Sequence, residues 1–392
     1  MSIRRITESN YEVRLSMTVD GVEQLIRKRG FTTKRAAQLF EAEKRQTRNV
    51  GGVLNASRLT LNDHSIDWLK SCKTTLKPTT YASYVNALNA YILPTLGEIA
   101  LRDLTTPRLQ TWVNELHESG KVGGGHGGQV HKGEPLSAKS VKNIHGALHA
   151  CLRRAVVLKR LAGNPADNVE LPRWIRPEMR SYSQEQLASI VTTADTDERW
   201  SGIWWLLFLS GIRRGEVLGL TWSQFDLDAG VVRIVHNRVL AGGREVITTP
   251  KTERGKRVIE LDEPTIERLR EWRKTQMKER MKAGSAWVGG DLATCSLVTN
   301  PNGSPTHTSS FRRRYNDLMK RAGVPAYTLH EARHTSITLL APYLPPHVLS
   351  RRAGHSSVSF TLDRYAHAMP QESRDAVNLL AESLTRRHKA AK

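Results

Sequence analysis

The chain contains 392 residues, which is enough for two or three domains with hydrophobic cores of their own. It carries 59 Lys and Arg residues against 38 Asp and Glu residues, and the formal net charge is +21. This charge favours a polyanionic partner, because cationic side chains that neutralise phosphates release the counterions held there. The longest apolar run, Ile203 to Leu209, is far shorter than the roughly 20 residues that span a bilayer, so we expect no membrane partner.

Cysteine usage argues against two further classes of protein. The three cysteines are odd in number and widely separated in the sequence: Cys72, Cys151 and Cys295. They predict neither a disulfide framework nor a cysteine-rich zinc site. The first residues also lack the apolar core of a secretory signal, so a reducing cytoplasm is the expected compartment.

Residues 1–48 are expected to form a small sheet with one helix and a basic edge. Apolar and polar residues alternate from Tyr11 to Met17, as in a half-buried strand, and Asp20-Gly21 suits a hairpin turn. A second run, Gln24 to Arg29, ends in a basic triplet formed by Arg27, Lys28 and Arg29, which are candidates for DNA binding. A helix capped by Thr33 follows, and three of its apolar residues are expected on one face: Ala36, Leu39 and Phe40.

Residues 58–172 have the periodicity of amphipathic helices. Apolar residues recur at three- and four-residue spacing in three segments, which run from Tyr81 to Ile92, from Leu109 to Leu116 and from Val141 to Leu152. A glycine-rich segment, Gly123–Gly128, separates the last two segments. A solvated insertion is its simpler interpretation and a DNA contact is the alternative. Lys139 and Lys142 are further DNA-binding candidates.

Residues 180–392 alternate helices with short strands, so the chain is expected to be α+β and mainly helical. The sequence from Ser183 to Gln186 suits a capping box, and an apolar helix is expected through Trp204. Strands are predicted at 231–235 and 257–261, with a hairpin across 241–243 between them. Helices are expected to resume after Asp262.

Four separated segments of this last region contain residues suited to chemistry. Each segment alone is weak evidence for a catalytic site, because an arginine pair usually lies on a solvated surface and a tyrosine on a helix usually packs in the core. The segments are Ser210-Gly-Ile-Arg-Arg-Gly-Glu216, Thr249-Pro-Lys-Thr252, His330-Glu-Ala-Arg-His-Thr335, and Gly354-His355 followed by Tyr365.

Together the segments supply what phosphoryl transfer on a DNA backbone needs when no metal takes part. The transition state spreads negative charge over the non-bridging oxygens, and the guanidinium forks of Arg213 and Arg333 suit that charge. A nucleophile, a base and an acid are also required, and Tyr365, His330 and Lys251 can fill these roles. A lysine suits the acid role because its pKa falls readily on desolvation beside arginines.

The order of these segments resembles the tyrosine recombinase family, in particular phage integrases. The family pattern runs Arg, Lys in a β-hairpin, His-x-x-Arg, Gly-His and Tyr, and the chain matches each element between Ser183 and His367. Two departures, Ala332 and Ala353 where leucine is common, are apolar and suit packing variants.

The resemblance implies a role for each matching residue. Arg213 and Arg333 would bind the scissile phosphate, which His355 would also contact by a hydrogen bond. Lys251 would be the general acid and His330 would assist proton transfer. Tyr365 would form a 3′-phosphotyrosyl intermediate, and Glu216 would support Arg213. Because the ester stores the bond energy, no metal, ATP or other cofactor is expected.

The resemblance also implies the domain plan and the partners. Residues 1–48 would bind arm-type DNA sites, residues 58–172 the core site, and residues 180–392 would carry the chemistry. The expected partners are double-stranded DNA attachment sites and three further copies of the chain in a tetramer on DNA, with a DNA-bending host factor and an excision factor as further candidates. A helix expected through Ala376 and Leu384 would dock on a neighbouring protomer or pack on its own domain. The expected location is the host cytoplasm, at the nucleoid.

Three alternatives stay open on the sequence. The segment from His330 to His334 matches the His-Glu-x-x-His pattern of zinc peptidases, in which Glu331 would be the base. Such a site needs a third ligand and explains neither Lys251 nor Tyr365. A catalytically inactive DNA-binding regulator of the same fold has no use for the complete set. A type IB topoisomerase shares the tyrosine chemistry, but the small N-terminal domain favours an integrase.

Overall fold

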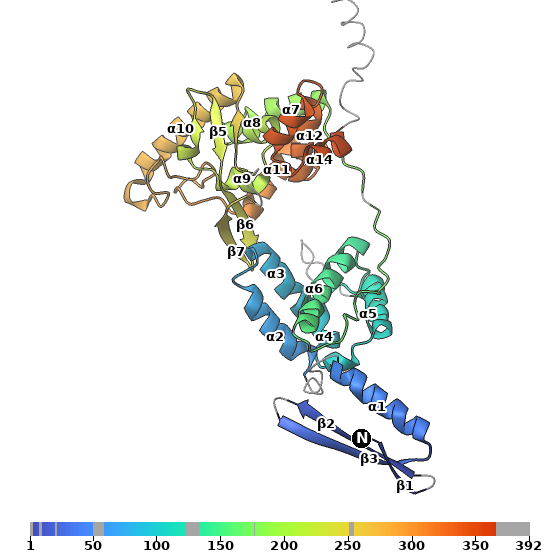
Figure 1. Ribbon diagram of the computed structural model, residues 1–392. Coiled ribbons are helices and arrows are strands. Elements are labelled where there is room, and N and C mark those ends of the chain that lie inside the picture. The colour runs from blue at the N-terminus through green and yellow to red at the C-terminus, as the bar shows by residue number, and fades with distance from the viewer. Residues whose placement is uncertain are drawn as a thin grey trace, which may run out of the picture. The chain divides into compact units, whose positions relative to one another are not determined.

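The computed structural model describes residues 3–7, 10–19, 22–49, 59–122, 133–175, 177–250 and 255–365, and Figure 1 labels their elements. The chain divides into two compact units, Met1–Arg176 and Pro177–Lys392. The mixed, mainly helical fold class is confirmed. Within the described ranges, none of the helices combines the length and the apolarity needed to cross a bilayer. The finer division into three domains remains a prediction.

A three-stranded antiparallel sheet begins the first unit, in the order β1-β2-β3. The elements are β1 Ile3–Thr7, β2 Asn10–Val19, β3 Val22–Phe31 and the helix α1 Lys34–Asn49. The two predicted strands and the cap at Thr33 are confirmed, since the Ala36 amide donates to Thr33 Oγ1 at 3.1 Å. The expected turn at Asp20-Gly21 lies outside the described residues.

One face of α1 differs from the prediction. Leu39 was expected on the buried face, but it is 66% exposed. Phe40 packs on the sheet as predicted, and Ala37 rather than Leu39 accompanies it against Val13. Residues three apart share a helix face, which fits the pair 36 and 39 as well as the pair 37 and 40, and packing against Val13 selects the second pair.

A helical bundle follows, built from five helices among residues 59–122 and 133–175. They are α2 Leu61–Cys72, α3 Pro78–Ala87, α4 Leu93–Leu96, α5 Thr106–Ser119 and α6 Ala138–Val157, with a π-helical turn at Leu88–Ile92 and a 3-10 turn at Leu101–Asp103. Trp112 and Leu148 lie in its buried core. The predicted apolar faces are therefore confirmed, whereas Gly123–Gly128 lies outside the described residues.

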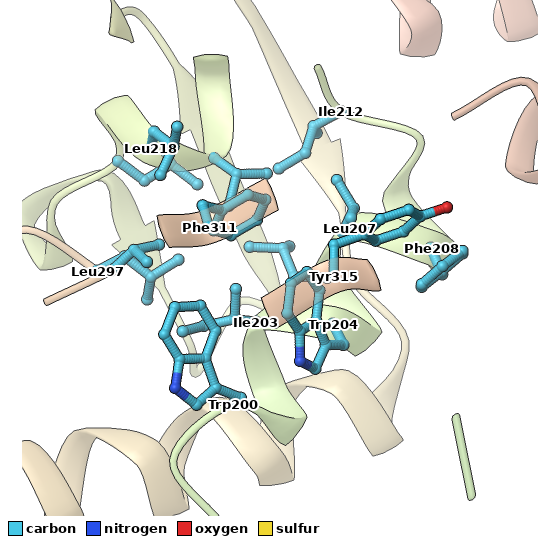
Figure 2. Packing of buried hydrophobic residues seen from close by; sticks show 14 of the residues in the cluster. Trp200, Ile203, Trp204, Leu207, Phe208, Ile212, Leu218, Leu297, Phe311 and Tyr315 are labelled. Atoms are coloured by element: carbon cyan, nitrogen blue, oxygen red, sulfur yellow. The ribbon is translucent and has the colours of Figure 1, made fainter. Parts of the chain in front are cut away.

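The second unit surrounds an apolar core with helices. These are α7 Gln184–Ala194, α8 Ser201–Ser210, α9 Arg214–Gly219, α10 Glu263–Ala283, α11 Thr308–Arg321, α12 Leu329–Leu340, α13 Pro346–Ala353 and α14 Val358–Tyr365. Short 3-10 turns lie at Trp222–Gln224 and Gly284–Ala286. The capping box from Ser183 to Gln186 is confirmed. Figure 2 shows Trp200 and Trp204 packed with Phe311, and the Trp204 and Phe311 ring centroids are 5.0 Å apart.

Two small sheets complete this unit. The strands are β4 Phe225–Asp226, β5 Val231–Ile234, β6 Asn237–Ala241, β7 Arg244–Thr248 and β8 Arg257–Glu260. β4, β5 and β8 form one antiparallel sheet, and β6 and β7 form the predicted hairpin. In β8, Arg257 and Ile259 are buried while Val258 is half exposed. This alternation directs the Arg257 side chain into the protein.

Two left-handed glycines end the helices that precede the candidate catalytic residues. Gly211 follows α8 with φ of 65°, and Gly354 follows α13 with φ of 62°. Glycine suits both positions because it has no Cβ, whereas L-residues adopt this conformation at a cost. The chain can therefore turn sharply at both points; His355 follows Gly354 directly, and Arg213 follows Gly211 after one residue.

Candidate active site

Arg213 lies at the start of α9 and is held from two sides. Its Nη1 donates to Glu216 Oε1 at 2.8 Å, and its Nη2 donates to the Gly354 carbonyl at 2.8 Å. The side chain remains 38% exposed. Arg213 is thus fixed in direction while its outer face can meet a ligand.

Glu216 is buried and accepts from two arginines. Each of its carboxylate oxygens takes one bond from Arg213, and Arg257 donates to the same two oxygens at 3.0 and 2.9 Å. Burial acts to raise the pKa of Glu216, but the hydrogen bonds and charge of Arg257 and the charge of Arg213 outweigh it and lower the pKa to about 2. The carboxylate is therefore ionised throughout the neutral range.

The sequence predicts a strand at Arg257 but assigns this residue no place in the site. Its side chain is 2% exposed, and Nε donates to the Arg352 carbonyl at 2.7 Å. An arginine at an inward position of a strand is the signal that could have found it, since buried arginines are almost always paired.

Arg333 lies on α12 with 1% of its surface exposed. It donates through Nη1 to the Gly211 carbonyl at 2.7 Å and through Nη2 to the Ala353 carbonyl. Burial, and then the charge of Arg213, lower the pKa of Arg333 to about 9. Arg333 and Arg213 therefore lie close enough to repel, an arrangement that an anion between them would stabilise.

His355 follows Gly354 and is buried next to Tyr365. Its Nδ1 lies 2.8 Å from Thr361 Oγ1, and its ring stacks on the Tyr365 ring with an interplanar angle of 6°. Burial, followed by the charges of Arg333 and Arg213, lowers the pKa of His355 to about 3. The imidazole is therefore neutral at pH 7.

Tyr365 ends α14, and its ring is fully buried beside Ile337 and Ala353. Burial raises the pKa of its phenol to about 12, although the charge of Arg333 acts to lower it. The phenol is thus protonated at neutral pH, and its hydroxyl forms a hydrogen bond with Nδ1 of His334.

His334 is the second residue that sequence reasoning missed as a partner of the tyrosine. The sequence indicates His334 only as the last residue of the His-Glu-x-x-His zinc pattern. His330, the predicted proton-transfer residue, lies one turn earlier on α12, and the two ring centroids are 4.4 Å apart. Part of the His330 surface is exposed to solvent, but the protein around its ring still desolvates the imidazole, and this desolvation, followed by the charges of Arg333 and Arg213, lowers the pKa of His330. The sequence signal that could have found His334 is its position, because it directly follows Arg333, a predicted catalytic residue.

Glu331 is engaged in a way that does not suit a peptidase base. It caps α12 by accepting from the Thr328 amide at 2.7 Å, and it pairs with Arg180 at 3.0 Å. Within the described ranges, no three His, Cys, Asp or Glu side chains are grouped to hold a metal. The zinc-peptidase alternative therefore gains no support from these residues.

The structure brings together five of the six predicted catalytic positions. Arg213, His330, Arg333, His355 and Tyr365 are linked by the contacts and charges described above. The sixth, Lys251, falls between β7 and β8 in the sequence and lies outside the described residues.

The predicted DNA-binding residues of the first unit are all exposed. On β3, Arg27 and Arg29 both contact the buried carboxylate of Glu12, which also pairs with Arg14. Lys28 lies over the Phe40 ring at 4.7 Å. In the helical bundle, Lys139 lies 4.7 Å from the Trp174 ring centroid, and Lys142 is exposed on the same helix.

Comparison with known proteins gives the same family from several directions. The model described as "Phage integrase family" matches residues 180–372, and that of the phage integrase N-terminal SAM-like domain matches residues 60–117. A tyrosine recombinase XerC-like protein of Caldanaerobacter subterraneus is 27% identical over 94% of this chain and 95% of its own length. The ICEBs1 integrase of Bacillus subtilis is 23% identical over 98% of this chain and 100% of its own length.

Solved structures show the same fold. The Tn1549 transposon integrase in complex with a circular intermediate DNA superposes with a TM-score of 0.63 at 20% identity, over 82% of this chain and 99% of that one. A lambda integrase dimer bound to a core site gives a TM-score of 0.54 at 16% identity, over 93% and 94% of the two chains. Two family models and relatives that align along nearly the whole sequence show that the chain belongs to the phage integrase family of tyrosine recombinases and is a site-specific DNA recombinase.

Proposed function

We propose that this recombinase cuts and rejoins DNA attachment sites through a 3′-phosphotyrosyl intermediate at Tyr365. The observation that carries the proposal is the gathering of two guanidinium groups, a neutral imidazole and a phenol from α9, α12, the α13–α14 turn and α14. Such a group suits a phosphodiester, whose charge needs cations and whose cleavage needs a nucleophile.

The scissile phosphate would occupy the position between Arg213 and Arg333. Both guanidinium groups are held by hydrogen bonds before any substrate arrives, so little reorganisation is needed when the transition state forms. His355, neutral because its pKa is low, would donate a hydrogen bond to a non-bridging oxygen.

In the cleavage step, the Tyr365 oxygen would attack phosphorus and form the ester while the bond to the 5′ oxygen breaks. The buried ring would first leave its pocket and its hydrogen bond with Nδ1 of His334 to reach the phosphate. The phenol proton would then pass to His330, and the 5′ oxygen would take a proton from Lys251. A 5′ hydroxyl from the partner strand would then attack the ester and reverse each transfer. The ester conserves the bond energy, so the cycle would require neither metal nor ATP.

The remaining assignments concern DNA and assembly. The basic sheet face of residues 1–48 would bind arm-type sites, and the helical bundle, with Lys139 and Lys142, would bind the core site. A lambda integrase tetramer has been solved on a Holliday junction, and by analogy four copies of this chain would assemble on paired sites. A host DNA-bending protein and an excision factor would set the direction of the reaction at the host nucleoid.

The decisive experiment uses a nicked suicide DNA that traps the covalent product. Wild-type protein should become linked to the labelled strand, and mass spectrometry should find the nucleotide on Tyr365. Tyr365→Phe should bind the same DNA with unchanged affinity and form no adduct. Adduct formation by this variant would refute the assignment of the nucleophile, and a wild-type protein that binds but never cleaves would favour the inactive regulator.

A further inference from the structure

The two hydrogen-bond partners of Arg213 share a support. One partner is the Glu216 carboxylate and the other is the Gly354 carbonyl. Arg257 binds both oxygens of Glu216 and also lies directly against Gly354. The direction of the Arg213 guanidinium therefore depends on Arg257, which acts on it through Glu216 and Gly354.

The contact between Arg257 and Gly354 is close. A Cβ atom built on Gly354 would lie 3.0 Å from Arg257 Nη1, so the guanidinium fills the space that a side chain would need. Arg257 also donates to the carbonyl of Arg352, two residues before Gly354, at 2.7 Å. It thereby fixes the backbone segment whose carbonyl receives Arg213.

Arg257 is too deeply buried to bind DNA. Its side chain is 2% exposed, compared with 38% for Arg213, and its donors go to Glu216, to Arg352 and, at 3.1 Å, to the Gly255 carbonyl. A buried bidentate arginine–carboxylate pair is a rigid unit, because both groups lose their partners together if either rotates.

We propose that Arg257 is a positioning residue for the phosphate-binding arginine: it orients Arg213 through Glu216 and through the backbone at Gly354. This inference rests on the proposed function, in which Arg213 binds the scissile phosphate. Arg257 also lies near the end of the segment that contains Lys251, so its support could instead serve the proton donor. The experiment must separate these two routes.

Three versions of one suicide substrate separate them, built on a core site that the wild-type protein cleaves. The first has an ordinary scissile phosphodiester. The second carries a neutral methylphosphonate, which removes one non-bridging charge and so reduces the need for a guanidinium. The third carries a 5′-bridging phosphorothiolate, whose thiolate leaves without a proton and so needs no general acid.

Arg257→Met should slow single-turnover cleavage of the phosphodiester by about 100-fold, the order expected for misplacement of a catalytic group by about 1 Å, with unchanged DNA affinity. The loss should shrink to less than about 10-fold on the methylphosphonate and persist on the phosphorothiolate. Arg233→Met, on the neighbouring strand β5, removes an exposed arginine and should leave all three rates unchanged.

The outcomes that overturn the proposal are distinct. Rescue by the phosphorothiolate alone would mean that Arg257 serves the proton donor, and rescue by neither substrate would mean a purely structural role. Since the single variant leaves the buried Glu216 with only one of its two arginine partners, the double variant Glu216→Gln with Arg257→Met provides a second test in a better balanced core, with the same rescue pattern expected. If Arg213→Ala is also not rescued by the methylphosphonate, the proposed role of Arg213 fails; if it is rescued and Arg257→Met is not, this inference alone fails.

Discussion

Among the residues that the structure describes, two clusters have one buried carboxylate that holds arginines, and they differ in whether one of those arginines is itself buried. In the N-terminal sheet, Glu12 pairs with Arg14, Arg27 and Arg29, whose side chains are 40%, 46% and 56% exposed. In the second unit, Glu216 pairs with Arg213, which is 38% exposed, and with Arg257, which is only 2% exposed. We refer to these as the Glu12 cluster and the Glu216 cluster.

The comparison shows how the same residue types serve two purposes. Exposed arginines keep their access to phosphates and lose little by being paired, because exposed ion pairs are weak and screened by salt. Buried arginines cannot exchange partners, so they hold a fixed geometry, as differential binding of a transition state requires. The Glu12 cluster therefore suits binding and the Glu216 cluster suits catalysis.

The largest difference is expected from the same substitution made in each cluster. Arg213→Lys keeps the charge and loses the fork, so single-turnover cleavage of a suicide core site should fall about 100- to 1000-fold. Arg14→Lys should leave the same rate unchanged. If Arg213→Lys cleaves at the wild-type rate, Arg213 is not part of the active site.

A second comparison removes the charge of each carboxylate. Glu216→Gln breaks a buried pair and should lower the free energy of unfolding of the second unit by about 3 kcal/mol, measured by urea denaturation with tryptophan fluorescence. Glu12→Gln should change stability much less but release its arginines. Its non-specific DNA affinity should rise while its preference for arm-site DNA falls. Equal stability losses in the two variants would contradict the distinction.

Two buried groups of the second unit, His355 and Glu216, should also make stability depend on pH. The pKa of His355 is lowered from 6.5 to about 3, so the unfolded chain binds this proton first and stability is lost as the pH falls below 6.5. Between pH 7 and pH 5 this residue should account for about 2 kcal/mol of the loss. The lowered pKa of Glu216 adds a further loss only below pH 4.5. In His355→Asn the free energy of unfolding should vary less between pH 7 and pH 5. If its slope against pH equals that of the wild type, His355 is not a buried neutral residue.

The smallest effect on cleavage is expected from removing the Glu12 cluster altogether. Deletion of residues 1–48 should leave core-site cleavage within about 2-fold of wild type, because the residues that carry the chemistry lie elsewhere. Recombination that depends on arm sites should be lost. The deleted protein should also lose the salt-dependent binding to arm-site DNA that the full chain shows. Full recombination on arm-containing DNA would refute the assigned role of this region.

Periodicity and local motifs predicted most of the elements. Alternation predicted β2, three- and four-residue spacing predicted α5 and α6, and the capping box at Ser183 placed the start of α7. Such signals are local, because hydrogen bonds and side-chain faces within one element depend on nearby residues. Leu39 shows the limit, since several apolar residues on one helix leave open which of them faces the core.

For the candidate site, the sequence by itself determined which residue types are present and in what order, and the family pattern joined Arg213, Arg333, His355 and Tyr365. Only the tertiary structure decided which side chains meet. Contacts between distant segments depend on how helices and strands pack, which is why Arg257 under Glu216 and His334 against the Tyr365 phenol emerged only from the folded chain. Burial decided the rest: it raises the pKa of Tyr365 and lowers that of His355, and the extent of burial is a property of the assembled core.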